Sequence, residues 1–253
     1  MTKLHLEGLG KVFGEGAGAV AALEDITIDV REGEFAVVVG PSGCGKSTLL
    51  NIVAGLEQGT AGQALINGRR IQGPGADRGM VFQSYTLFPW LSVRKNVEFG
   101  LRIKGLPAAQ RARIARRYLK LVGLEEFENA LPKALSGGMK QRTAIARVLA
   151  NSPDMLLMDE PFGALDAQTR LQLQDLLLDV WREESATVLF ITHDIDEAIL
   201  LADTIHIMSR RPGRIIKSIT VDIPRPRDHR TSLRPEFTAI KKDIMETLWE
   251  ELS

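Results

Sequence analysis

The sequence has little cysteine, few aromatic residues and no excess of either charge. Cys44 is the single cysteine among 253 residues, so no disulfide can form within the chain, and a reducing, cytosolic compartment fits best. Lys plus Arg and Asp plus Glu both number 32, which gives a formal net charge of zero. Because a dedicated nucleic-acid-binding protein normally carries a basic excess, we expect no nucleic-acid partner.

Long hydrophobic runs are also missing. The sequence contains no stretch of about 18 apolar residues, which is the length a transmembrane helix needs. Its first residues, Met1–Glu7, lack the charged-then-apolar layout of a signal peptide. With 44% hydrophobic and 25% charged residues, the chain has the composition of a globular protein with a sizeable core. We therefore expect it to reach a membrane only through a partner.

Short apolar runs alternate with helical patterns, which predicts an α/β fold with a largely parallel sheet. Buried strands are expected at Phe35–Val39, Met155–Met158 and Thr187–Ile191, with a weaker one at Ile205–Met208. The periodicity of residues 167–184 predicts a helix with Leu171, Leu178 and Trp181 on one face.

Other parts of the chain have different patterns. Residues 4–30 alternate loosely between apolar and polar, which favours an antiparallel β layer with a glycine-rich turn at Gly14–Gly18. Helical periodicity dominates residues 87–152, notably at 107–122 and 138–151. We expect one domain over 1–253, made of a core with an antiparallel β layer (1–86 and 153–221), an inserted helical subdomain (87–152) and a surface tail (222–253).

A glycine-rich loop directly follows the first buried strand. Residues Gly40–Ser47 match the pattern G-x-x-x-x-G-K-[ST], and a helix is expected from Ser47 to Gly55. Glycines let backbone N–H groups turn towards phosphate oxygens, and the helix N-terminus adds further unpaired donors. Lys46 can reach the β- and γ-phosphates, and the Ser47 hydroxyl can ligate Mg²⁺. The sequence thus predicts a P-loop that binds a nucleotide. Cys44, inside this loop, is interpreted as a small filler residue.

Two more groups of polar residues follow predicted core strands. Asp159 and Glu160 end the strand at 155–158, where P-loop NTPases hold Mg²⁺ with an aspartate. A carboxylate directly after that aspartate can orient or deprotonate an attacking water. His193 ends the strand that begins at Thr187, at the edge where α/β sheets place ligands, and can hydrogen-bond a γ-phosphate. Asp194 and Glu197 indicate a helix start.

The run Leu135-Ser-Gly-Gly-Met-Lys-Gln-Arg142, followed by Thr143–Arg147, resembles the LSGGQ signature of ABC transporter ATP-binding subunits. The resemblance implies a P-loop NTPase of the ABC ATPase type, with a RecA-like core, an antiparallel β layer and a helical subdomain. It also implies that ATP lies between two subunits in a head-to-tail dimer. The signature helix of each subunit then faces the nucleotide of the other.

The family's other motifs occur here in order between residues 13 and 193, so the resemblance assigns a complete site. It implies catalytic roles for Glu160 as base, His193 as switch histidine and Gln83 as Q-loop glutamine. Metal ligands would be Ser47, Gln83 and Asp159, and Phe13 would stack on adenine. The implied nucleotide-binding set is Phe13, Gly40, Pro41, Ser42, Gly43, Cys44, Gly45, Lys46, Ser47, Thr48, Ser136, Gly137, Gly138 and the D-loop residue Asp166.

Two positions depart from the family pattern. Met139 replaces the usual glutamine of the signature, and Gly163 replaces the usual serine before Ala-Leu-Asp166. Both departures concern fine details of the implied cross-dimer hydrogen bonds and leave the class of protein unchanged. A core position for Phe13 is the alternative to adenine stacking.

The chain also resembles the nitrate/sulfonate/taurine importer branch of the family. The residues that carry this likeness are Leu87–Trp90, Asn96–Leu101, Ser209–Ile215 and Ile223–Arg227. The branch implies a peripheral subunit on the cytoplasmic face of a bacterial membrane. Its partners would be a second ATPase, identical or paralogous, a transmembrane permease and, indirectly, a substrate-binding protein. An ABC exporter or lipid-transport ATPase, and a soluble ABC ATPase in DNA repair or translation, are the alternatives.

Two surface interpretations stay open. Residues 84–101 would line the groove for a permease helix, and the alternative is that Tyr85, Leu87, Phe88 and Trp90 pack inside the helical subdomain. Seven basic residues without an acid fit either a solvated helix face or a contact with anionic lipid or the permease. These are Arg102, Lys104, Arg111, Arg113, Arg116, Arg117 and Lys120.

Overall fold

The structure is a computed structural model that describes residues 1–251, and the chain divides into two compact units. The first unit holds residues 1–75, 157–159 and 185–251. The second unit holds residues 76–156 and 160–184. No helix within residues 1–251 is both long and apolar enough to cross a membrane.

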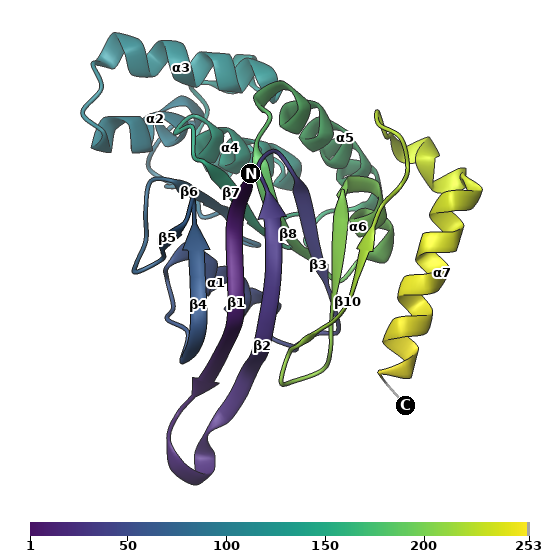
Figure 1. The fold of residues 1–253 in the computed structure, drawn as a ribbon. Helices are drawn as coiled ribbons and strands as arrows, with labels where there is room; N and C mark the ends of the chain where they lie inside the picture. The colour runs from purple at the N-terminus through teal and green to yellow at the C-terminus, as the bar shows by residue number, and fades with distance from the viewer. Residues whose placement is uncertain (252–253) are drawn as a thin grey trace. The chain divides into compact units, whose positions relative to one another are not determined.

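A small antiparallel sheet forms one layer of the first unit, with strand order β2-β1-β4-β5. Figure 1 shows β1 and β2 as a long purple hairpin. The alternating pattern of residues 4–30 predicts this layer correctly, and the turn at Gly16–Gly18 is a short 3-10 helix, η1. The strands are β1 (Thr2–Phe13), β2 (Val20–Arg31), β4 (Ala61–Ile66) and β5 (Arg69–Arg70).

A second sheet forms the core of the first unit, in the order β10-β9-β3-β8, with the end of β7 beside β8. Strand β3 is parallel to both β8 and β9, whereas β10 is antiparallel to β9. Every residue of β3 and β8 is buried, which explains their continuous apolar sequence. The strands are β3 (Phe35–Val39), β7 (Met155–Asp159), β8 (Thr187–Thr192), β9 (Thr204–Met208) and β10 (Ile215–Thr220).

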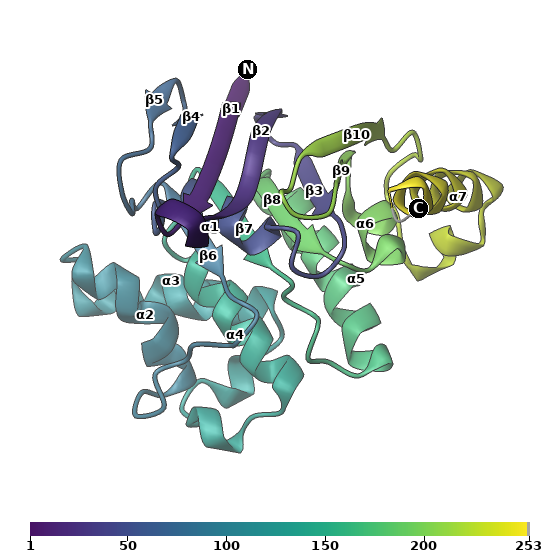
Figure 2. The same cartoon turned by 90° about the horizontal axis from the view of Figure 1, so that it is seen from below.

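Three α-helices belong to the first unit: α1 (Lys46–Ala54), α6 (Ile195–Leu201) and α7 (Pro235–Glu250). Helix α1 packs on β8 and β2, and α6 packs on β3 and β8. Helix α7 lies along α6, as both views show (Figures 1 and 2), and a 3-10 helix, η4 (His229–Leu233), precedes it. Phe237 and Ile244 of α7 are buried, so this part of the tail packs against the rest of the first unit.

The second unit is mainly helical. Helices α2, α3 and α4 pack on one another (Figure 2), and α4 also packs on β6 and α5. The start of β7 pairs with β6, a strand that the sequence patterns do not reveal. Its elements besides β7 are β6 (Arg78–Val81), α2 (Val93–Ile103), α3 (Ala108–Leu121), η2 (Glu125–Phe127), η3 (Pro132–Ala134), α4 (Gly137–Leu149) and α5 (Ala167–Glu184).

The second unit does not share the boundaries of the predicted helical subdomain at 87–152. It begins earlier, at Ala76, and it includes α5. The division into core, helical subdomain and tail stays a prediction.

Helix α5 has the predicted bounds but a different buried face. Its buried stripe follows Leu173, Leu177 and Val180, with Leu178 beside it, whereas Leu171 is exposed. The prediction for Leu171 is therefore wrong. The spacing of residues 171 and 178 fits a helical face, but the spacing of 173, 177 and 180 fits one equally well, and packing within the unit selects the latter.

Candidate functional site

The loop between β3 and α1 has the backbone that a phosphate site needs. Gly45, the N-cap of α1, has φ 114°. A Cβ at this position would lie 2.7 Å from the Ala22 carbonyl oxygen, so both conformation and space require glycine. Because a glycine cap has no side chain to accept a hydrogen bond, the first N–H groups of α1 face the loop without a side-chain cap. Such an end suits an anion.

Lys46 places its positive charge within this loop. The side chain is only 5% exposed, and its ammonium donates hydrogen bonds to the carbonyls of Gly40 (2.8 Å) and Pro41 (3.0 Å). These two carbonyls hold the ammonium over the loop, where phosphate oxygens can accept from it as a mobile point charge.

Cys44 lies beside Lys46 and is buried, with its sulfur 3.9 Å from the Lys46 Nζ. Burial raises the pKa of the Cys44 thiol, although the Lys46 charge acts in the opposite direction. The thiol is thus protonated at neutral pH, and this favours the filler interpretation over a reactive thiolate.

Ser47 and Asp159 come together in the first unit. The Ser47 hydroxyl donates to Asp159 Oδ1 at 3.1 Å, which joins the start of α1 to the end of β7. A hydroxyl and a carboxylate are oxygen ligands of the kind Mg²⁺ prefers. Within residues 1–251 no cluster of three or more His, Cys, Asp or Glu suits a metal. Two protein oxygens nevertheless fit Mg²⁺, because this ion usually binds one or two protein groups together with phosphates and waters.

His193 leaves the sheet beside the phosphate loop. Thr192 of β8 is the register partner of Val39 in the parallel strand β3, so His193 and Gly40 follow neighbouring strands at the same edge. His193 is exposed, and α6 begins two residues later. Asp194 caps α6 by accepting from the Glu197 N–H at 3.1 Å, so the predicted helix start is confirmed.

Phe13 lies at the end of β1 and is 41% exposed, so the alternative of a core phenylalanine is wrong. The Lys11 ammonium stands 4.7 Å from the ring centroid, and Glu57 and the Gln58 carbonyl hold it there at 2.7 and 2.9 Å. The exposed ring is available for stacking, and its adenine role stays a prediction.

Glu160 and Gln83 belong to the second unit, where both lie near Gly163. A Cβ at Gly163 would be 3.6 Å from Gln83 Nε2 and 3.8 Å from Glu160 Oε2. Glu160 has φ 42°, a left-handed conformation that is uncommon for a residue other than glycine. Such backbone strain gathers at functional positions, and here it occurs directly after strand β7.

The signature residues begin helix α4. Ser136 caps the helix by accepting from the Met139 N–H at 3.3 Å. Both glycines have packing reasons, because a Cβ at Gly137 would lie 2.9 Å from the Tyr85 hydroxyl and one at Gly138 would lie 2.5 Å from Thr169 Cγ2. The small residues therefore serve the unit's own packing as well as any nucleotide role.

Asp166 likewise has a role within its own unit. Its carboxylate accepts from the Thr169 N–H at 3.0 Å, at the start of α5. Hydrogen bonds from Thr169 hold the pKa of Asp166 below its usual range. This contact explains an aspartate here without a nucleotide, and the D-loop role stays a prediction.

Sequence reasoning missed a contact that holds Thr86, three residues after Gln83. Thr86 has φ 45°, which is strained for a β-branched residue. The Arg147 guanidinium donates to the Thr86 carbonyl at 2.7 Å and to its hydroxyl at 2.9 Å. The positive φ is invisible in the sequence, and Arg147 lies 61 positions further along.

A cavity of about 390 Å³ adjoins this contact in the second unit. Its apolar lining includes Phe88 and Phe99, whose ring centroids are 4.2 Å apart, and Ile103, which is 74% exposed. Cationic side chains complete the lining, from Arg78, Lys104 and Arg147.

Buried Asn96 organises the loop before α2. Its side-chain amide donates to the carbonyls of Phe88, Leu91 and Ser92 and accepts from the Phe88 N–H at 2.8 Å. Trp90, in this loop, is 73% exposed. The alternative that Trp90 packs inside the helical subdomain is therefore wrong, whereas Tyr85, Leu87 and Phe88 are half-buried.

The basic stretch at 102–120 is largely paired within the unit. Lys104 and Arg111 donate to the carbonyls of Asn151 and Leu106, Arg116 pairs with Glu128 and Arg117 with Glu184. The Glu128 partner raises the pKa of Arg116. Both surface interpretations stay open for the exposed residues Arg102, Arg113 and Lys120.

The site residues define a P-loop nucleotide-binding protein, and comparison with known proteins places it more closely. Residues 23–163 match the ABC transporter family. The chain is 34% identical to the ATP-binding cassette MJ0796, solved as a dimer bound to ADP and phosphate, with a TM-score of 0.76 over 87% of this chain and 100% of that one.

Two curated relatives are similar over nearly their whole length. The nitrate import ATP-binding protein NrtD of Synechocystis is 47% identical, with 97% of this chain and 95% of the relative covered. The aliphatic sulfonates import ATP-binding protein SsuB of Bacillus licheniformis is 48% identical, with 93% and 90% covered. The chain belongs to the ABC transporter family. It is an ATPase coupled to transport.

Proposed function

We propose that this chain is the ATP-hydrolysing subunit of an ABC importer for nitrate, a sulfonate, taurine or a similar small solute. The observation that carries the proposal is the uncapped glycine start of α1, with Lys46 held over it and Ser47 joined to Asp159. The solute class is supported by the similarity to nitrate and sulfonate import subunits, together with the branch motifs.

In this proposal the phosphate loop binds the triphosphate. The backbone N–H groups at the start of α1 donate to its oxygens, and Lys46 changes its hydrogen bonds from the loop carbonyls to the β- and γ-phosphates. Ser47 and Asp159 would hold Mg²⁺, with Gln83 as a further ligand. When bound, Mg²⁺ supplies neutralisation of charge on the phosphate oxygens.

Hydrolysis needs a base and a group that recognises the γ-phosphate. Glu160 follows Asp159 in the chain and takes the proton of the attacking water. His193 leaves β8 beside Gly40 and hydrogen-bonds the γ-phosphate. Two copies, or this chain and a paralogue, close on ATP with the Ser136–Gly138 end of one facing the phosphates of the other. Hydrolysis then reopens the pair.

The permease docks at the cavity of the second unit. Phe88, Phe99 and Ile103 offer an apolar surface, Trp90 is exposed beside Phe88 (ring centroids 5.8 Å apart), and the cations of the lining suit a partner helix that carries carboxylates. The ATPase thereby works at the cytoplasmic face of the membrane. It selects no solute itself.

Affinity purification of the full chain from mildly solubilised native membranes, followed by mass spectrometry, tests the proposal. We expect a polytopic permease in stoichiometric amount. An Ile103→Asp variant should lose it, because the substitution puts a carboxylate at the apolar lining, whereas Leu233→Asp, at an exposed leucine of the first unit, should keep it. Recovery of the wild-type chain without a membrane partner would contradict the importer and support a soluble ABC ATPase.

A further inference from the structure

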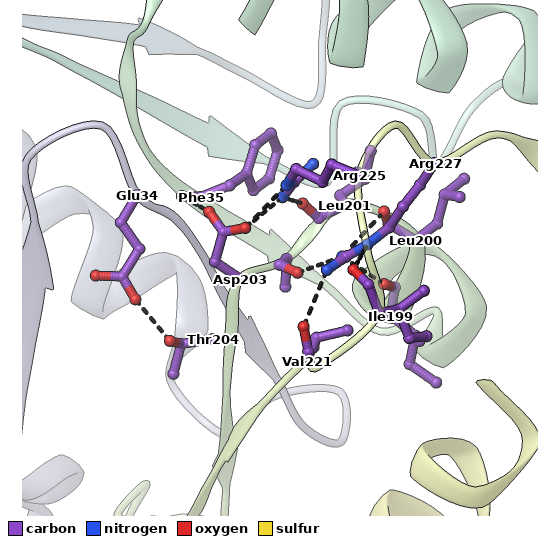
Figure 3. Close-up of polar contacts among 12 residues, drawn as sticks. Glu34, Phe35, Ile199, Leu200, Leu201, Asp203, Thr204, Val221, Arg225 and Arg227 are labelled. Carbon is purple, nitrogen blue, oxygen red and sulfur yellow. Dashed lines mark hydrogen bonds and ion pairs between the residues drawn. The ribbon is translucent and has the colours of Figure 1, made fainter. Parts of the chain in front are cut away.

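Two arginines from the segment after β10 lie at the carboxyl end of helix α6 (Figure 3). Arg227 is only 6% exposed, and its guanidinium donates to the carbonyls of Ile199 (3.2 Å) and Ala202 (2.5 Å), with a longer contact to Leu200. Arg225 donates to the carbonyl of Leu201 at 2.7 Å. Together they bind four consecutive carbonyls at the end of α6, the groups that a helix itself leaves without partners.

Arg227 also anchors its own segment. It donates to the carbonyls of Ile223 at 2.9 Å and Val221 at 3.0 Å, so one side chain joins the end of α6 to the start of the C-terminal segment. Burial lowers the pKa of Arg227 to about 10, which leaves it charged at neutral pH. A cation at a helix C-terminus also interacts favourably with the helix dipole.

Arg225 extends the cluster to strand β3. It binds Asp203 Oδ1 through two nitrogens at 2.9 and 2.7 Å, and the other Asp203 oxygen accepts from the Phe35 N–H at 2.9 Å. Phe35 begins β3, the strand that leads into the phosphate loop. The neighbouring residue Glu34 accepts from the Thr204 hydroxyl at 2.6 Å. The end of α6 is thereby tied to the start of the phosphate-loop strand.

The other end of α6 begins at Ile195, two residues after His193. The helix has only seven residues, Ile195–Leu201, so its own hydrogen bonds are few, and packing on β3, β8 and α7 together with the contacts at its carboxyl end holds it in place. The helix is only about 10 Å long, so its carboxyl end, where the arginines bind, lies close to the start that follows His193.

We propose that Arg225 and Arg227 are positioning residues for ATP hydrolysis, which hold α6 so that His193 stays in register with the phosphate loop. The inference rests on the proposed role of His193 at the γ-phosphate. The arginines do not touch the nucleotide in this account. They act through the histidine, and their loss should lower kcat while MgATP binding is retained.

The test uses the full-length chain with Arg227→Ala, Arg227→Lys and Arg225→Gln, assayed for kcat, KM and MgATP affinity well below each variant's Tm. We expect kcat to fall about tenfold in Arg227→Ala, as for other small displacements of a reacting group. KM and affinity should stay within about twofold, since the phosphate loop is untouched. The loss of kcat in Arg227→Lys should be smaller, because the lysine ammonium keeps the charge and can replace some of the guanidinium hydrogen bonds.

Two controls separate positioning from simple destabilisation. Arg230→Ala removes an exposed arginine from the same segment and should leave kcat unchanged. Ile28→Ala creates a cavity in the small sheet, away from α6, and should lower Tm without a loss of kcat below Tm. A kcat loss in Ile28→Ala equal to that in Arg227→Ala would overturn the proposal.

A double mutant tests the route through the histidine. If Arg227 acts through His193, adding Arg227→Ala to His193→Ala should lower kcat little further, whereas independent effects multiply. If the losses of kcat in the two single variants multiply in the double mutant, the positioning role is overturned. It is also overturned if kcat is normal in every arginine variant while His193→Ala has lost activity. Neither result would affect the proposed function of His193. A normal kcat in His193→Ala would remove the proposed function of the histidine and this inference with it.

Discussion

Two helices of this protein begin at residues expected to face phosphate, and they begin differently. The N-cap of α1 is Gly45, which has φ 114° and no side chain, whereas the N-cap of α4 is Ser136, in extended backbone, whose hydroxyl accepts from the Met139 N–H. The first has donors ready for a ligand and a lysine held above them. In α4, one backbone N–H of the first turn already donates to the cap residue Ser136.

The two helix N-termini thus offer a phosphate group different numbers of unpaired N–H donors. A glycine cap leaves the first donors of α1 without a side-chain acceptor, so a bound anion can accept from them. A serine cap stabilises α4 in the absence of any ligand, and the packing of Gly137 and Gly138 on Tyr85 and Thr169 gives these residues a second purpose. We therefore expect nucleotide affinity to reside at α1, and the α4 end to contribute only when two subunits close.

The largest expected effect on kcat is at Glu160, which belongs to neither of these two helices. Glu160→Gln should lower kcat by about 10²- to 10⁴-fold, because a general base contributes that much. ATP should still bind at α1, and the ATP-bound dimer should persist longer in size-exclusion chromatography with light scattering. Glu183→Gln, the same change at an exposed residue, is the control. Near-normal hydrolysis would remove Glu160 from the base role.

At α1, Lys46→Ala should weaken MgATP affinity about 10- to 100-fold, because a hydrogen bond to a charged group contributes about 1.5–3 kcal/mol. Fluorescent-nucleotide titration measures the change, and Lys242→Ala, at an exposed lysine, should leave affinity unaltered. Unchanged affinity in Lys46→Ala would contradict the expectation that nucleotide affinity resides at α1.

At α4, Ser136→Ala should lower the free energy of unfolding by about 1 kcal/mol through loss of the cap. Ser92→Ala removes an equivalent cap from α2, where the hydroxyl accepts from the Lys95 N–H, and should have a similar effect in urea unfolding. Only Ser136→Ala should also weaken the ATP-dependent dimer. If both variants dimerise alike, the signature end has only its structural role.

The smallest effect is expected at Cys44. Burial raises the pKa of this thiol, so the reactive thiolate is scarce at neutral pH and becomes more populated only as pH rises towards and beyond the ordinary value of 9.0. Iodoacetamide should modify Cys44 slowly near pH 7.5 and faster as pH increases, and Cys44→Ser should retain ATPase activity. Rapid alkylation at neutral pH would show a reactive thiol instead.

Much of the first unit follows from local sequence. The continuous apolar runs of β3 and β8 predict buried strands, and the glycines and Lys46 predict the loop between β3 and α1. These predictions succeed because backbone conformation and burial in this part of the chain depend on residues close in sequence. Strand β6 escapes the same reasoning, since Arg78–Val81 is short and includes a glycine and a charge.

Long-range contacts explain the other failures. The spacing of Leu171, Leu178 and Trp181 is helical, but packing of α5 selects the stripe through Leu173 and Leu177 instead. A tail rich in charge and proline reads as surface, yet Arg227 is buried, because the free carbonyls at the end of α6 accept its hydrogen bonds. Neither partner of such a contact can be recognised from its own neighbours in the chain.

The sequence by itself determined the class of this protein and its phosphate loop, because each depends on a short run with a defined backbone requirement. Only the tertiary structure decided which polar groups hold those runs in place: Asp159 on Ser47, Arg147 on Thr86, and Arg227 on the end of α6. These partners are 112, 61 and 25 positions apart in the chain. Folding brings them together because apolar strands and helices are buried, and that burial does not depend on the polar partners themselves.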